Sequence, residues 1–111
     1  MNRNDLWIKN NNIEDNYENI KLIFKSFNLK EKEDFWLEDN SIKFRKIWKN
    51  HERIYKVIVD KKKCSLLIYL RDIVRGKDNK ESYHLFKKKD GEPYLFNGFD
   101  PWVACIKFLI R

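Results

Sequence analysis

Apolar and polar residues first alternate along this chain with the period of a helix. Over residues 13–27 the apolar positions 13, 17, 20, 24 and 27 fall on one face of a helix. Asn12 before this run suits a helix N-cap, and Asp15 places negative charge in the first turn. Asn28 suits the left-handed residue that follows many helices, with Leu29 as its apolar follower. The pattern therefore predicts one helix over about residues 13–27.

After residue 34 the period changes to the two-residue alternation of strands. Alternating stretches cover residues 42–49, 54–59 and 64–71, and shorter apolar runs cover 35–37, 83–88 and 94–96. Turn-like segments separate these runs at 38–41, 50–52, 61–63 and 75–81, and Asp90-Gly91 is a typical hairpin pair. The chain between residues 35 and 96 therefore predicts an antiparallel meander of five or six strands.

A second helix is predicted to begin at Pro101, because Asp100 offers a capping carboxylate and proline is favoured at the first helical position. Its apolar face is expected to contain Trp102, Cys105, Ile106, Leu109 and Ile110. Strands bracketed by two helices predict an α+β fold with both helices packed on one sheet face. We expect a single domain over residues 1–111, with 1–12 as a loosely packed N-terminal arm.

Composition supports a compact core that is rich in aromatic rings. The 111 residues are 42% hydrophobic and 15% aromatic, and no apolar run approaches the length that a membrane crossing needs. The first ten residues contain no apolar signal-peptide region, so we expect a cytoplasmic protein. In that reducing compartment Cys64 and Cys105 are expected to be free, buried thiols.

The positive charge is concentrated in the C-terminal two-thirds of the chain. Residues 1–41 hold 6 Lys or Arg against 9 Asp or Glu, whereas residues 42–111 hold 18 against 8, and the net charge is +7. This asymmetry favours a polyanion or an acidic protein surface as partner. A lysine-rich coding bias is the alternative explanation, because Lys supplies 18 of the 24 basic residues.

No familiar catalytic or cofactor motif is found. Three isolated glycines exclude dinucleotide and phosphate-loop fingerprints, and the His and Cys positions lack the pair spacing of a zinc site. The acidic residues of 31–39 have no calcium-loop spacing and indicate a solvated connector. We therefore expect neither metal nor cofactor. The alternative is a small ribonuclease in which His84, or a tyrosine such as Tyr69, assists attack by the ribose hydroxyl.

The strand pattern points to a binding face instead. Cations and occasional rings on a sheet can follow a nucleic-acid backbone and stack on its bases. The residues expected to contact nucleic acid or another partner are Lys43, Arg45, Lys49, Tyr69, Arg71, Lys87, Lys61, Lys62 and Lys63. In element order, residues 53–110 are similar to the single-strand-binding transcriptional coactivator family, which implies single-stranded nucleic acid as a ligand but carries over no individual residue.

The competing interpretation is an inhibitor or adaptor that acts on a nuclease or nucleoprotein. A small Lys/Asn-rich domain of this kind resembles in character the accessory proteins of phages and mobile elements, such as anti-CRISPR proteins. Such a protein is expected to depend on a few aromatic anchors, and Trp7, Trp36 and Tyr94 lie near predicted element ends. An exposed edge strand would also allow a homodimer.

Overall fold

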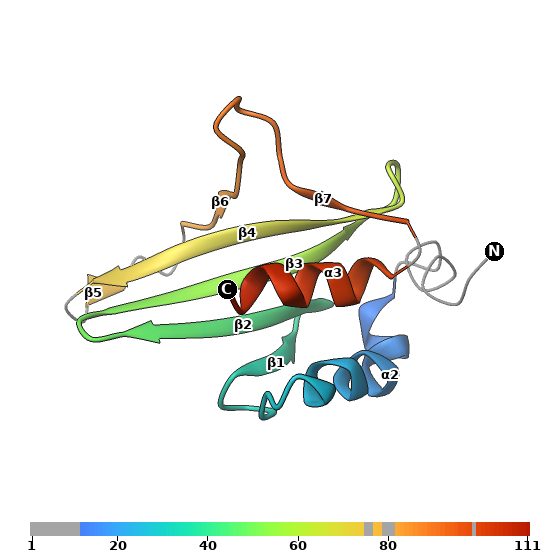
Figure 1. The fold of residues 1–111 in the computed structure, drawn as a ribbon, viewed down its shortest axis with the longest axis horizontal. Helices are drawn as coiled ribbons and strands as arrows, with labels where there is room; N and C mark the ends of the chain where they lie inside the picture. The colour runs from blue at the N-terminus through green and yellow to red at the C-terminus, as the bar shows by residue number, and fades with distance from the viewer. Residues whose placement is uncertain (1–11, 75–76, 79–81, 99) are drawn as a thin grey trace.

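The computed structural model describes residues 12–74, 77–78, 82–98 and 100–111 (Figure 1). Two helices bracket a sheet of seven strands, so the predicted α+β fold with an N-terminal helix, an antiparallel sheet and a C-terminal helix is confirmed. The elements are α2 (Ile13–Ser26), β1 (Phe35–Glu38), β2 (Ser41–Trp48), β3 (His51–Asp60), β4 (Ser65–Val74), β5 (Lys77–Asp78), β6 (His84–Leu85), β7 (Leu95–Phe96) and α3 (Pro101–Leu109). Of the predicted arm at residues 1–12, residues 1–11, with Trp7, lie outside the described residues, and Asn12 is the N-cap of α2.

Both ends of α2 form as the sequence predicts. The Asn12 side chain accepts a hydrogen bond from the backbone N–H of Asp15 at 3.2 Å, which satisfies one donor of the first turn. At the other end Asn28 adopts a left-handed φ of 62°, and the N–H of Leu29 donates to Phe24 O. This is the Schellman arrangement, and Leu29 packs against the core as its apolar contact.

The sheet is antiparallel throughout, with strand order β1-β2-β3-β4-β5. The short strands β6 and β7 both pair with β4, at Tyr69–Leu70 and Leu66–Leu67 respectively. The chain between them leaves the sheet as a projecting turn around Asp90 and Gly91, and this excursion is visible above β4 in Figure 1. As a result three short strands pair along the edge of β4 that faces away from β3. The corresponding edge of β2 pairs with β1 over only part of its length.

The hydrophobic core lies on one face of the sheet, beneath both helices. In the strand register Ile42 faces Val57 and Val57 faces Ile68, so these side chains form one row on the same face. The buried cluster contains Ile13, Tyr17, Ile20, Phe24, Phe35, Ile42, Phe44, Tyr55, Val57, Leu66, Ile68, Trp102, Cys105, Ile106 and Leu109. Because α2, α3 and these alternate strand residues share one cluster, both described helices lie on this face and neither of them covers the opposite face.

Two expectations about the middle of the sheet were wrong. The turn after β2 contains only Lys49 and Asn50, so His51 begins β3 instead of lying in a three-residue turn. Cys64 is exposed and has a φ of 48° in the turn before β4, whereas a buried strand position was expected. The first error starts β3 too late and the second starts β4 one residue too early, because a turn residue gives no period of its own.

Three further expectations fail near the C-terminus. The run 83–88 forms a strand only at His84–Leu85, because β4 offers it a short pairing before the chain leaves the sheet. In α3, four of the five predicted apolar residues are buried, but Ile110 lies past the last helical residue and is 40% exposed. Asp100 occupies the N-cap position without a capping hydrogen bond from its side chain.

Candidate functional site

The candidate site lies on the sheet face opposite the helices, which we call the helix-free face. Strand register brings its side chains into rows: Lys43 faces Lys56, and Lys56 faces Tyr69. In the next row Arg45 and Arg71 flank Ile54 on either side. Four cations from three adjacent strands therefore lie on one face of the sheet, although they span positions 43 to 71 of the sequence.

One tyrosine ring lies at the centre of these cations. The Nζ atoms of Lys43 and Lys56 lie 5.5 Å and 5.1 Å from the ring centroid of Tyr83, and the guanidinium carbon of Arg71 lies 5.1 Å from it. Lys56 Nζ also lies 5.9 Å from the ring centroid of Tyr69. Each separation suits a cation–π contact, which holds the cations close together despite their mutual repulsion.

The edge of the helix-free face adds a third ring and two carboxylates. The Arg45 guanidinium carbon lies 5.1 Å from the Trp36 ring centroid, and its Nε lies 2.8 Å from an oxygen of Glu52. Lys43 is only 5% exposed, and its Nζ donates to Glu38 Oε2 at 2.9 Å. The hydrogen bond from Lys43 is the main reason that the pKa of Glu38 lies below its usual value, and this effect outweighs partial burial.

The structure brings together some of the residues predicted to bind, and separates others. Lys43, Arg45, Tyr69 and Arg71 lie on the helix-free face, as expected from their alternation with core residues. Exposed Lys49 lies in the β2–β3 turn, Lys61–Lys63 lie in the turn after β3, and Lys87 lies beyond β6 opposite Pro93. The structure therefore gathers four of these predicted residues on one face and leaves the other lysines in separate segments.

The predicted aromatic anchors also fall in different environments. Trp36 is half-buried on the helix-free face beside Arg45. Tyr94 is half-buried and packs on Phe86 and Phe108, with ring centroids 5.1 Å and 4.6 Å away, so it extends the core. Among the described tryptophans, Trp48 is the exposed one, with 42% of its surface accessible. The sequence pattern placed Trp48 in a strand and did not mark it as an aromatic anchor.

Sequence reasoning missed two residues of the helix-free face. Lys56 was overlooked because β3 reads as apolar on both faces, although its alternation with Tyr55 and Val57 places it on the face with Ile54. Tyr83 carries no such signal, because it reaches the three cations from the chain segment before β6 and not from a long strand. Only tertiary structure could place that ring.

A second polar cluster lies on the other face, near the β2–β3 turn. His51 Nε2 and Arg53 Nε lie 2.8 Å and 2.7 Å from the same oxygen of Asp72. The ring centroids of Trp48 and His51 lie 5.0 Å apart. Partial burial raises the pKa of Asp72, but the hydrogen bonds from Arg53 and His51 lower it further, so the net pKa is below its usual value.

The other candidate groups for chemistry stand apart. His84 is exposed in β6, opposite Leu70, and its ring makes no hydrogen bond or ion pair with any residue that the structure describes. Within the described ranges there is also no group of three His, Cys, Asp or Glu side chains placed to hold a metal ion. No described helix has the length and apolar character to cross a membrane.

Comparison with protein-family models, with curated proteins and with solved structures finds no significant match to this chain.

Proposed function

We propose that this protein is a non-enzymatic binding protein that engages the nucleic-acid part of a nucleoprotein, with single-stranded nucleic acid lying on the helix-free face. The observation that carries the proposal is the gathering of Lys43, Lys56 and Arg71 around the ring of Tyr83. The three cations come from adjacent strands of a rigid sheet, so their spacing does not depend on a flexible loop.

Electrostatics favours a polyanion at this position. Three like charges within reach of one ring repel each other, and a phosphate backbone relieves that repulsion while releasing its own counterions. Glu38 pairs with Lys43, and Glu52 pairs with Arg45. These two carboxylates offset part of the repulsion among the cations, and a polyanion would offset more of it.

The rings favour a single strand over a duplex. Tyr69, Tyr83 and Trp36 lie among the cations, and unstacked bases can pack on such rings while phosphates contact the neighbouring charges. Neither helix offers a comparable basic surface for a major groove, because α3 carries only Lys107 and α2 pairs Lys21 with Glu18.

The test is a salt titration with fluorescein-labelled single-stranded DNA and RNA, read by fluorescence anisotropy. We expect tighter binding of single strands than of the matched duplex, and a logarithmic affinity that falls linearly with the logarithm of salt concentration. Lys56→Gln should make that slope shallower by about 0.7, the value for one lost phosphate contact with a single strand.

Lys62→Gln is the matched control, because it removes the same charge from the exposed turn after β3. If Lys62→Gln changes affinity and slope as much as Lys56→Gln does, binding follows net charge and the helix-free face is not the site. If single strands do not bind at low salt, the proposal is wrong.

An inhibitor or adaptor that binds a nuclease directly is the second candidate function. It is favoured by the exposed Trp48, since exposed aromatic residues often anchor protein interfaces. A partner protein that copurifies equally well after nuclease treatment, and whose binding is insensitive to Lys56→Gln, would support this function over nucleic-acid binding.

A further inference from the structure

The second half of β2 forms an open edge of the sheet. Strand β1 pairs with β2 only as far as Phe44, whereas β3 pairs with β2 up to Trp48. The N–H of Arg45 still donates to Asp34 O at 2.8 Å, and beyond it no described strand lies beside β2. Figure 1 shows this stretch of β2 at the border of the sheet, next to the β2–β3 turn.

The backbone of this edge points its hydrogen-bonding groups outward. Successive residues of a strand direct their N–H and C=O groups to alternate sides. Because Arg45 directs its N–H away from β3, toward Asp34, Ile47 two residues later directs its N–H and C=O to the same side. An additional strand at this edge would therefore meet a donor and an acceptor in ladder geometry.

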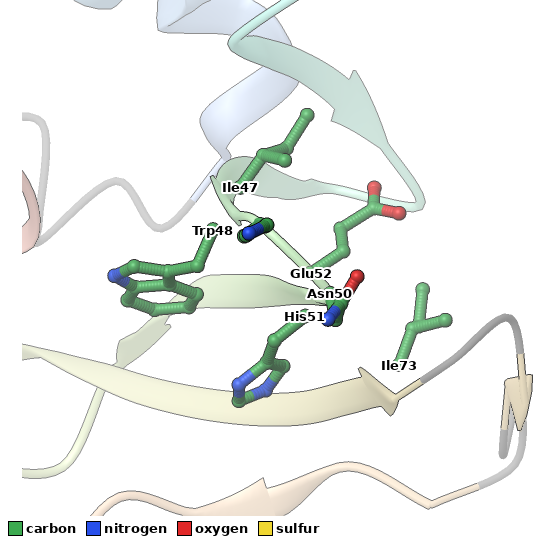
Figure 2. A pocket seen from close by; sticks show the side chains of 7 residues that line it. Ile47, Trp48, Asn50, His51, Glu52 and Ile73 are labelled. Carbon is green, nitrogen blue, oxygen red and sulfur yellow. The ribbon is translucent and has the colours of Figure 1, made fainter.

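Two exposed apolar side chains flank those backbone groups. Ile47 is 69% exposed and Trp48 is 42% exposed, and they lie on opposite faces of the sheet. Figure 2 shows the two side chains pointing in different directions from the hairpin. Both side chains line an open cleft of about 330 Å³. Lys46, Arg53 and His51 contact the Trp48 ring and fix its orientation, which lowers the entropy cost of using it as an anchor.

The charge of this edge selects the kind of strand that can join it. Lys46 and Lys49 carry positive charge beside Ile47 and Trp48, and they are preceded by Arg45, whose guanidinium pairs with Glu52. If a second copy paired antiparallel with Ile47 opposite Ile47, Arg45 would face Lys49 twice, and like charges in that position are destabilising. A segment with acidic residues would instead meet complementary charge.

We propose that the β2 edge Arg45–Lys49 binds an extended segment of a partner protein that alternates apolar and acidic residues and adds to the sheet as a further strand. Main-chain hydrogen bonds to Ile47 would supply affinity, and contacts with Ile47 and Trp48 on the two faces would supply specificity. The edge shares Arg45 with the helix-free face, but the backbone of Ile47 and the ring of Trp48 lie outside the cluster around Tyr83, so a peptide-binding assay without nucleic acid tests this interaction by itself.

The probe is a display library of short random peptides, selected on the immobilised full chain. We expect selected peptides to alternate apolar residues with Asp or Glu, and the best synthetic peptide to bind in solution. N-methylation of the peptide amides that face β2 should weaken binding at least about tenfold, because each lost backbone hydrogen bond costs about 1 kcal/mol or more. This measurement leaves the protein itself unchanged.

Substitutions in the protein give the second arm. Ile47→Pro, with its fold checked by circular dichroism, should weaken the peptide to a similar degree, and Trp48→Ala should weaken it as well. Leu22→Ala is the matched control, because Leu22 is 65% exposed on α2 and is not part of the β2 edge. Its peptide affinity should equal that of the unchanged chain.

Three outcomes would overturn the proposal. The first is a library that yields no binder, or binders without acidic residues. The second is a selected peptide whose affinity is changed neither by N-methylation of its amides nor by Trp48→Ala in the protein. The third is sedimentation showing a homodimer that Ile47→Pro dissociates, since the occupant of the edge would then be a second copy.

Discussion

The imidazole Nε2 of His51 lies 2.8 Å from Oδ1 of Asp72, and this contact joins β3 to β4 beside the β2–β3 turn. Arg53, which faces Asp72 directly across the two strands, donates to the same oxygen at 2.7 Å. One carboxylate thus accepts from two side chains of the neighbouring strand. This arrangement fixes the end of the sheet that holds the open β2 edge.

Asp72→Asn should destabilise the protein by about 1 kcal/mol. Hydrogen bonds to a charged partner are worth about 1.5–3 kcal/mol, and the Asp72 side chain is 35% exposed, so solvent screening reduces that value. Urea unfolding followed by circular dichroism measures the change. Glu33→Gln, in an exposed pair with Lys30, is the control and should be neutral. Equal stability of Asp72→Asn and the unchanged chain would show that the network contributes nothing.

The stabilisation by Asp72 should disappear in acid. The pKa of Asp72 in the folded protein is below its ordinary value of 3.8, so the unfolded chain takes up a proton first as the pH falls. The contribution is therefore complete above the ordinary pKa and is lost as the pH falls through the lower, folded value. Unfolding free energies from about pH 6 to pH 3 should show the gap between the unchanged chain and Asp72→Asn closing only below about pH 4. A gap that stays constant to pH 3 would contradict this assignment.

The sequence predicted the parts of the fold where local chemistry and periodicity agree. The α2 helix has its cap at Asn12 and its left-handed end at Asn28, and the structure confirms both. Strand alternation also placed Arg45 and Arg71 correctly on the face opposite the core. Such features depend on neighbours within a few residues, which a single sequence displays directly.

The candidate site was predicted less completely because it depends on contacts between distant segments. The position of Tyr83 above β2, β3 and β4 follows from where the chain re-enters the sheet, and no local pattern encodes that. His51 was assigned to a turn because polar residues surround it, and its partner Asp72 lies 21 positions away. The open edge at Ile47 likewise follows from the shortness of β1, which the sequence does not fix.

The two cysteines should react at very different rates. Cys64 is exposed, whereas Cys105 is fully buried and its pKa is raised by that burial, which disfavours the reactive thiolate. A disulfide reagent should modify Cys64 at once and Cys105 more than about a thousandfold more slowly. The reagent reaches Cys105 only in molecules that have transiently unfolded, and a free energy of unfolding of about 5 kcal/mol makes such molecules rare. Mass spectrometry of a reaction time course measures both rates, with denatured protein as control. Comparable rates in the folded protein would place Cys105 outside the core.

The ring of Tyr83 should matter more to nucleic-acid binding than its hydroxyl. Tyr83→Phe keeps the ring that Lys43, Lys56 and Arg71 surround, and should retain most affinity for single strands. Tyr83→Leu removes it and should cost about 1–3 kcal/mol of binding free energy, the range for losing one base-stacking ring. Anisotropy titrations of both variants, after their stabilities are compared, test this. Equal affinity of both variants would exclude Tyr83 from the binding site.

Single-stranded RNA should remain intact when the protein binds it. Acid–base cleavage needs a titrating group within hydrogen-bond reach of the reacting hydroxyl. His51 Nε2 contacts Asp72 on the sheet face that carries α2 and α3. His84 is exposed and pairs across from Leu70, whose side chain lies on that same face. Both histidines therefore lie opposite the helix-free face, where we place the nucleic acid. Gel analysis of a labelled RNA, incubated with excess protein, should therefore show no new fragments. Cleavage that disappears in His51→Ala, His84→Ala or Tyr69→Phe would make the protein a ribonuclease, whereas cleavage unchanged in all three variants would trace to a contaminating nuclease.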